Sequence, residues 1–314
     1  MSPRRLSPAA AALLLLSLAA PAAAQDLAIR AGRLVVAADQ APIAGGIVLI
    51  RQGRVAAIGT EVVVPRGVTL HQRPQAWVVP GFVDAHVAWG LRGDLDETAA
   101  PIQPDVDLAL RVDPSHRDYA DARGAGVTTG LLAPGFSNLF GGVGATLKST
   151  GKVFGERVAK LTLGSSATSS RRPPTSRAGL LELLRGTLER EHEGGEGFLA
   201  DFARGAIVGL VSVDGVAGLR EMRELQARYG LRLLIDLRGN LRPAELEGLD
   251  LSGASIALGP MGPNSNALMR RQAASLVARG AAISFISRLP LQSAQGARLA
   301  AHHAVQAGLE PELA

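Results

Sequence analysis

The 314-residue sequence contains no cysteine, so disulfide bonds and thiolate metal sites are excluded. The cellular compartment therefore cannot be inferred from cysteine usage. Aromatic residues make up 4% of the chain, and no basic stretch is interleaved with them, which argues against nucleic-acid binding. Beyond the first two dozen residues, no segment approaches the roughly 20 apolar residues that a membrane-spanning helix needs. We therefore expect neither a nucleic-acid partner nor an integral membrane segment in the mature protein.

The N-terminus has the three parts of a secretory signal peptide. Arg4 and Arg5 form a basic start, residues 9–20 an apolar run, and the alanines at 22–24 an A-x-A cleavage site before Gln25. The apolar run is too short for a comfortable membrane span, and a buried N-terminal helix is the alternative. We expect an exported protein, periplasmic or extracellular, with a signal peptide over residues 1–24.

The composition is that of a folded globular chain. Hydrophobic residues make up 47% of the sequence, which supports a sizeable core, and the formal net charge of +5 is small and scattered. The length suits one large α/β domain or two modest ones.

Residues 25–75 read as short β-strands. Strands are expected over 27–36, 46–58 and 62–70, with a hairpin turn at Gln52-Gly53. These strands are too few to bury both faces of a free-standing all-β domain.

Residues 76–314 alternate between strand and helix patterns. Strands are expected over 126–132, 145–149, 206–213, 231–236, 254–258 and 281–286, and helices over 114–123, 177–188, 219–228, 266–279 and 294–307. Strand and helix in succession imply parallel strands with helical crossovers. We predict an α/β fold, a TIM-like (β/α)₈ barrel, with a doubly wound open sheet as the alternative.

The stretch 78–90 carries the most chemical information. It reads as a buried strand over 78–83, with a Pro-Gly break inside, that runs into a loop bearing Asp84 and His86. A polar pair at the C-terminal end of an apolar strand is where a barrel enzyme places its active site.

Two motifs resemble the amidohydrolase superfamily, of the secreted imidazolonepropionase-like kind. They are Pro80-Gly81-Phe82-Val83-Asp84-Ala85-His86 and Ala125-Gly126-Val127-Thr128-Thr129, and the resemblance runs from about Leu27 to the last residue. It implies that residues 25–75 form part of a small β-sandwich and that residues 76–314 form the barrel. It also implies a divalent metal such as zinc, and a hydrolase acting on carbon–nitrogen bonds other than peptide bonds.

Most of the metal ligands that this resemblance implies are missing. His86 stands at the first histidine position of the family motif, but Ala88 stands at the second. The fifth strand, which should end in a histidine near Val213, has none, and the sixth offers Asp236 and Arg238. His86 alone is not a zinc site, which takes three or four ligands.

Arg288 stands where the family has a proton-shuttling aspartate. Arginine stays protonated and cannot act as a base. We expect His86, Val213, Asp236 and Arg288 to gather at one mouth of the barrel. We also expect Arg288 to pair with Asp84 or Asp236, and Asp84, Asp236, Arg238 and Arg288 to line the site. Lys148 lies late in a predicted strand and could serve as a carbamylated bridging ligand of a metal. An ordinary buried or surface lysine is the favoured alternative.

The sequence ends at Ala314, where family members continue with another helix and return to the sandwich, so we expect a truncated chain. Two functions remain open. One is a catalytically inactive relative that binds a small molecule or a related amidohydrolase subunit. The other is a metal-dependent hydrolase of cyclic amides or other non-peptide carbon–nitrogen bonds.

Overall fold

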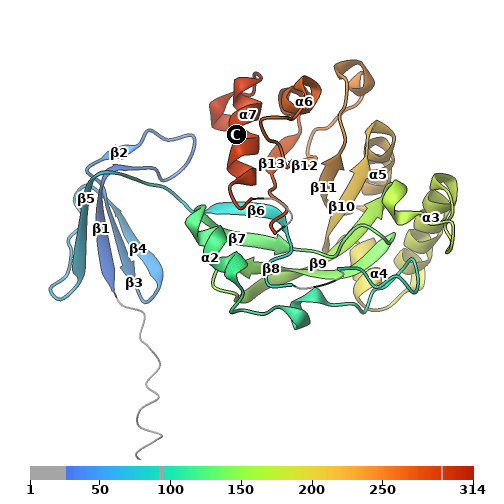
Figure 1. The fold of residues 1–314 in the computed structure, drawn as a ribbon, viewed down its shortest axis with the longest axis horizontal. Coiled ribbons are helices and arrows are strands. Elements are labelled where there is room, and N and C mark those ends of the chain that lie inside the picture. Colours follow the sequence, from blue (N-terminus) through green and yellow to red (C-terminus); the bar gives the residue numbers. More distant parts are fainter. Residues whose placement is uncertain (1–25, 92, 94, 291–292) are drawn as a thin grey trace, which may run out of the picture. The chain divides into compact units, whose positions relative to one another are not determined.

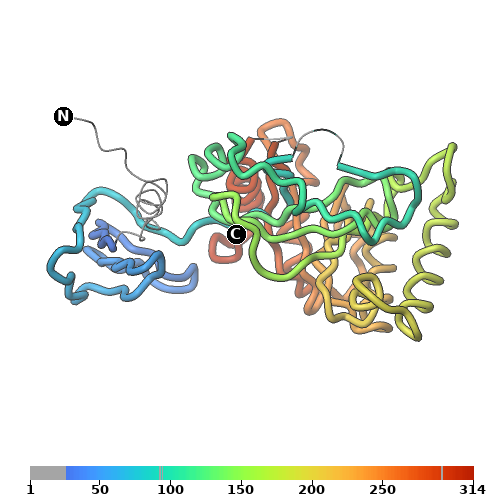
Figure 2. Tube along the Cα trace, turned by 90° about the horizontal axis from the view of Figure 1, so that it is seen from below, coloured from blue at the N-terminus to red at the C-terminus, as the bar shows by residue number. Residues whose placement is uncertain are grey.

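The computed structural model describes residues 26–91, 93, 95–290 and 293–314, so the predicted signal peptide lies outside the described residues. The chain divides into two compact units, the first ending at Pro80 and the second beginning at Gly81. Colour along the chain separates them in Figures 1 and 2, where the N-terminal unit is blue to cyan.

The described part of the N-terminal unit forms one five-stranded sheet. Its strands are β1 (Leu27–Leu34), β2 (Ile43–Ala44), β3 (Ile47–Arg51), β4 (Arg54–Gly59) and β5 (Thr69–Val78). Gln52 and Gly53 join β3 to β4 with positive φ angles of 52° and 73°, as a two-residue hairpin turn requires. The predicted hairpin is confirmed, whereas the second sheet of a sandwich is not.

The motif stretch is divided between the two units, so the prediction of one buried strand over 78–83 is wrong. Val78 ends β5, and the barrel strand β6 (Phe82–Val87) begins only after Pro80-Gly81. Proline has no backbone N–H and cannot continue a strand ladder. Phe82 and Val83 are 41% and 63% exposed, and β6 becomes buried from Asp84 onward.

The second unit is built on an eight-stranded, nearly closed barrel sheet (Figure 1). After β6, the strands are β7 (Val127–Leu132), β8 (Phe140–Lys148), β9 (Val153–Leu163), β10 (Val208–Asp214), β11 (Arg232–Arg238), β12 (Ser255–Leu258) and β13 (Ala282–Phe285), in that spatial order. The helices are α2 (Arg117–Gly124), α3 (Arg177–Gly194), α4 (Phe198–Ala203), α5 (Val216–Tyr229), α6 (Ala267–Val277) and α7 (Gly296–Gln306). Short 3₁₀ turns are η1 (Leu108–Arg111), η2 (Ser165–Ala167), η3 (Pro243–Leu246) and η4 (Pro311–Leu313).

One strand departs from the predicted parallel arrangement. Strand β8 runs antiparallel to both β7 and β9. Its connections, residues 133–139 and 149–152, are too short for the helical crossover that a parallel pair needs. Strand β9 was not among the predicted strands.

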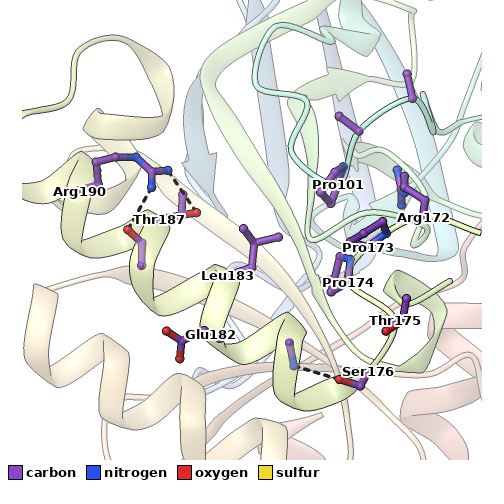
Figure 3. Close-up of a pocket in the computed structure, with 14 residues that line it drawn as sticks. Pro101, Arg172, Pro173, Pro174, Thr175, Ser176, Glu182, Leu183, Thr187 and Arg190 are labelled. Atoms are coloured by element: carbon purple, nitrogen blue, oxygen red, sulfur yellow. Dashed lines mark hydrogen bonds between the residues drawn. The ribbon is translucent and has the colours of Figure 1, made fainter. Parts of the chain in front are cut away.

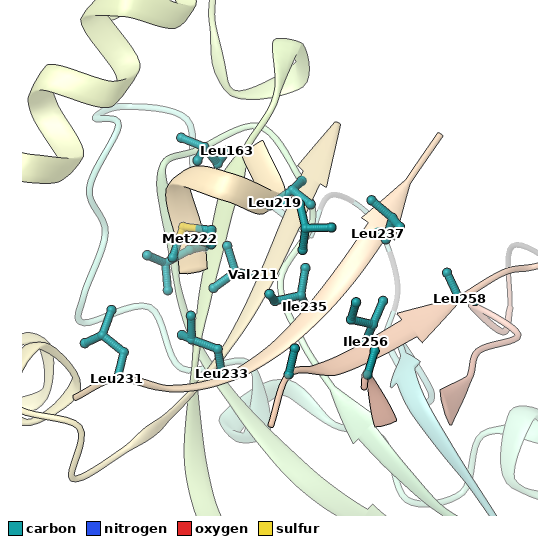
Figure 4. Close-up of a cluster of buried hydrophobic side chains, with 14 of the residues drawn as sticks. Leu163, Val211, Leu219, Met222, Leu231, Leu233, Ile235, Leu237, Ile256 and Leu258 are labelled. Atoms are coloured by element: carbon teal, nitrogen blue, oxygen red, sulfur yellow. The ribbon is translucent and has the colours of Figure 1, made fainter. Parts of the chain in front are cut away.

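The main apolar core fills the space between the outer face of the sheet and its helices. Val211 of β10 and Ile235 of β11 pack there with Leu219 and Met222 of α5 (Figure 4). Side chains alternate between the two faces of a strand. The residues between these apolar ones, including Ser212 and Asp236, therefore point into the barrel.

Candidate functional site

Polar side chains gather inside the barrel, toward the C-terminal ends of its parallel strands. The buried members are Asp84, His86, Lys160, Thr162, Ser212, Asp236 and Ser287, each at most 5% exposed. Buried polar groups are costly unless they are hydrogen-bonded, and these bond to one another.

Asp236 is the acceptor at the centre of this network. It accepts hydrogen bonds from Ser212 Oγ at 2.9 Å and from Arg288 Nη2 at 2.8 Å, and its Oδ2 lies 3.2 Å from His86 Nδ1. Burial alone would raise the pKa of Asp236, but the contact with His86 and the charges of Arg288 and Lys160 outweigh it and hold the pKa below its usual range. Asp236 is therefore an ionised carboxylate occupied by three donors.

Arg288 reaches this carboxylate from the end of the last barrel strand. Its side chain is 17% exposed, and its backbone has a φ of 55°. The expectation that Arg288 pairs with an acid is confirmed, and the partner is Asp236. Asp84 acts on Arg288 only through its charge.

His86 points its Nδ1 at Asp236 and its ring edge at Phe136, with 5.4 Å between the ring centroids. Burial lowers the pKa of His86, and Asp236 only partly offsets this effect. The neutral ring with its proton on Nδ1 donates to Asp236. His86, Asp236 and Arg288 thus meet, as predicted for strands one, six and eight. Val213 does not join them, because it faces the outer core and Ser212 takes its place.

Asp84 ties the two ends of the sheet together. It accepts hydrogen bonds from the Ser287 backbone N–H at 3.1 Å, from Ser287 Oγ and from the His86 backbone N–H at 3.3 Å. Burial raises the pKa of Asp84 to about 6 despite these donors. Nearby, Ala88 N–H donates to the Leu289 carbonyl at 2.9 Å.

Lys160 is a charged site residue that sequence reasoning missed. It lies on β9, is fully buried, and donates to the Leu161 carbonyl at 2.8 Å and to Thr162 Oγ1 at 2.9 Å. Burial lowers the pKa of Lys160 to about 7. The available signal was a lysine inside the apolar stretch 158–163. Lys148 is exposed instead and bonds Thr129 Oγ1, so it does not reach this network.

Phe136 is surrounded by positively charged side chains. The Lys160 Nζ lies 4.8 Å from its ring centroid, and the guanidinium carbons of Arg238 and Arg288 lie 4.1 and 5.5 Å away. Asp96 holds the Phe136 loop by accepting from the backbone N–H groups of residues 136 and 137 at 3.2 Å. Arg238, predicted to line the site, belongs to this cluster.

The donor set does not fit a divalent metal. Among the described residues, no three histidine, cysteine, aspartate or glutamate side chains are grouped to hold an ion. His86 and Asp236 face each other, and Asp236 already carries the Arg288 guanidinium. A zinc site takes three or four ligands, so two mutually engaged donors beside a fixed cation are insufficient.

A groove of about 780 Å³ lies apart from these residues, between α3 and the chain around residues 99–101 and 172–176. Figure 3 shows Pro101, Pro173 and Pro174 across the groove from Leu183 of α3. No residue of the buried polar network lines it. In the part of the chain that the structure describes, no helix is both long enough and apolar enough to cross a membrane.

The second unit is a nearly closed αβ barrel of the TIM type, with polar side chains toward the ends of its strands. Comparison with solved structures agrees. An amidohydrolase from Thermotoga maritima superposes with a TM-score of 0.78 at 19% identity, covering 91% of this chain and 85% of that one. A prolidase solved with N-methylphosphonate-L-proline gives a TM-score of 0.53 at 16% identity, covering 92% and 84%. Another amidohydrolase gives 0.50 at 14% identity, with the same coverage.

No protein-family model matches the sequence. No curated protein matches it either. The resemblance to the amidohydrolase superfamily that the motifs indicate is confirmed at the level of the fold.

Proposed function

We propose that this chain is a catalytically inactive relative of the amidohydrolases, a binding protein or a partner subunit of a related amidohydrolase. The observation that carries the proposal is the hydrogen bond from Arg288 to Asp236, beside His86, at the ends of the barrel strands. A guanidinium is permanently charged, so it cannot accept a proton, and its charge opposes a metal ion beside it.

Electrostatics favour this reading over a metal-dependent mechanism. Two unit charges 4 Å apart interact by about 4 kcal/mol at the effective dielectric of a protein surface. A divalent ion placed against Asp236 would meet the repulsion of Arg288 and Lys160 and would have to displace Arg288 from its acceptor. Asp236, which is hydrogen-bonded to Arg288, Ser212 and His86, is not free to bind a metal or to activate a water.

The competing proposal is a metal-dependent hydrolase of non-peptide carbon–nitrogen bonds, such as those of cyclic amides. The fold and the juxtaposition of His86 with Asp236 favour it. It requires further ligands and the departure of Arg288 from Asp236.

Metal content separates the two proposals. The full chain would be produced with zinc, manganese and iron supplied, dialysed, and measured by plasma mass spectrometry. We expect well below one metal ion per chain. A stoichiometric metal that is lost in an Asp236→Ala variant would overturn the inactive-relative proposal, and a metal retained by that variant would show binding elsewhere.

A second test asks whether chemistry can be restored. Arg288→Asp puts a carboxylate where the amidohydrolase resemblance expects one, yet the histidines of the fifth and sixth strands are still absent. We expect no turnover of a cyclic imide or a dipeptide by this variant. Turnover would mean that the metal ligands have been misassigned.

A further inference from the structure

The cations around Phe136 outnumber the carboxylates that contact them. Three positive side chains, Lys160, Arg238 and Arg288, lie within 5.5 Å of the ring centroid. Of these three cations, only Arg288 forms an ion pair with Asp236. Asp96 acts on Lys160 through its charge, but its hydrogen bonds go to the Phe136 loop.

Arg238 is the least compensated of the three. Its hydrogen bond goes to the hydroxyl of Ser166 at 3.2 Å, and no carboxylate within the described ranges lies at ion-pair distance from it. Its guanidinium carbon is 4.1 Å from the Phe136 ring centroid, so the aromatic face supplies its closest electrostatic support. The Arg238 side chain is partly exposed.

Arg288 is fixed by Asp236 and keeps one side-chain N–H donor without a partner among the described residues. Its Nη2 is taken by Asp236, but its Nε is buried with no hydrogen-bond partner among the described residues. Unpaired buried donors are uncommon in folded proteins and call for an acceptor. Its left-handed backbone, at φ 55°, is a conformation that non-glycine residues keep chiefly where the surroundings impose it.

We propose that Arg238 and Arg288, with the buried Lys160 on the same aromatic ring, form a binding site for a small organic carboxylate whose apolar part packs against Phe136. The inference rests on the proposed function, because it treats the strand ends as a metal-free binding site. Arginine matches a carboxylate through its planar set of N–H donors. Arg238 and Arg288 together carry one more charge than Asp236 offsets, which suits a monoanion. The adjoining aromatic ring suits an apolar substituent rather than a fully hydrated inorganic ion.

The test is isothermal titration calorimetry of the full chain with benzoate, acetate and inorganic phosphate at one ionic strength. We expect saturable binding of one benzoate per chain, tighter than acetate or phosphate. Arg238→Gln should weaken benzoate binding by about tenfold, as expected for the loss of a charge-assisted hydrogen bond. Arg232→Gln, at the opposite end of the same strand β11 and exposed, is the matched control and should bind as the parent does.

Phe136→Leu tests the apolar wall without altering charge. It should bring the benzoate affinity closer to that of acetate and leave acetate binding unchanged. Thermal melts would verify that each variant is folded. Benzoate binding that is absent, insensitive to Arg238→Gln, or matched by phosphate would overturn the proposal.

Metal content measured on the same sample separates this inference from the proposed function. A metal-free protein that does not bind benzoate defeats only the carboxylate site. Benzoate binding that requires a stoichiometric metal, and is lost on chelation, defeats both.

Discussion

At the residue scale, Arg288 combines an unfavourable backbone conformation with a favourable side-chain hydrogen bond to Asp236. The left-handed conformation costs a residue other than glycine roughly 1–2 kcal/mol. The hydrogen bond to the fully buried Asp236, at 2.8 Å, offsets this cost. The same contact occupies one carboxylate oxygen of Asp236, so the conformation of Arg288 and the engagement of Asp236 are linked.

Arg288→Ala is expected to lower the free energy of unfolding by roughly 3–5 kcal/mol, because it leaves a buried carboxylate without its cation. Urea denaturation would measure the loss, with Arg232→Ala as the exposed control. A loss equal to that of the control would show that the Arg288 side chain is hydrated and contributes little.

The buried Lys160 side chain is expected to make the stability of the protein depend on pH. The folded pKa of about 7 lies below the unfolded value of 10.5, so between these values the unfolded chain binds more protons than the folded one. Stability from this group therefore rises with pH over that window, by about 5 kcal/mol in all.

Lys160→Met, which has no titratable group, should flatten the rise in stability between pH 7 and 10 relative to the parent. Chemical denaturation at several pH values measures the difference. Lys148→Met is the control, since that lysine is exposed. Equal pH slopes in the parent and in Lys160→Met would contradict a buried, titrating lysine.

At the element scale, the barrel is joined between β6 and β13 by side chains and by the segment after β13. Asp84 of β6 receives the backbone N–H and the hydroxyl of Ser287, and Ala88 bonds Leu289. Within the described residues no strand ladder pairs β6 with β13. The aspartate of the motif therefore has a structural role that does not depend on any metal.

Ser287→Ala removes one donor from the buried Asp84 carboxylate and should cost about 1–3 kcal/mol of stability. The hydroxyl favours the ionised form, so its removal raises the pKa of Asp84 further, and the loss should be larger above pH 6 than below pH 4. Ser284→Ala in β13 is the matched control, because its buried hydroxyl has no partner in the described chain. Equal effects of the two substitutions on melting temperature would show that Asp84 does not need Ser287.

At the scale of the whole molecule, the division after Pro80 separates an N-terminal β-sheet unit from the barrel. The polar network and the basic cluster around Phe136 belong to the barrel unit alone. The proposed binding functions therefore rest on residues of the barrel unit.

Export is a prediction for the intact chain. If residues 1–24 are a signal peptide, protein recovered from the periplasm or medium should begin at or near Gln25. Intact-mass spectrometry of exported material measures this directly, with a variant carrying aspartates in the apolar run 9–20 as the control that should stay inside. Exported protein that keeps Met1 would rule out cleavage.

Local patterns in the sequence predicted much of the fold. The Gln52-Gly53 hairpin, the helix after Ser176 and the regular succession from β10 to α7 followed from turn chemistry, capping and periodicity, which act over a few residues. The pairing of Arg288 with an acid followed from the cost of burying an unpaired charge.

Tertiary structure decided the rest, because it depends on residues far apart in the chain. The antiparallel direction of β8 is set by its pairing with two neighbouring strands. Side chains alternate between the two faces of β9, and this alternation points Lys160 into the barrel. Which acid Arg288 takes, Asp236 and not Asp84, depends on where β11 ends relative to β13. The gathering of Lys160, Arg238 and Arg288 around Phe136 joins four separate segments, and no pattern along the sequence contains that distance information.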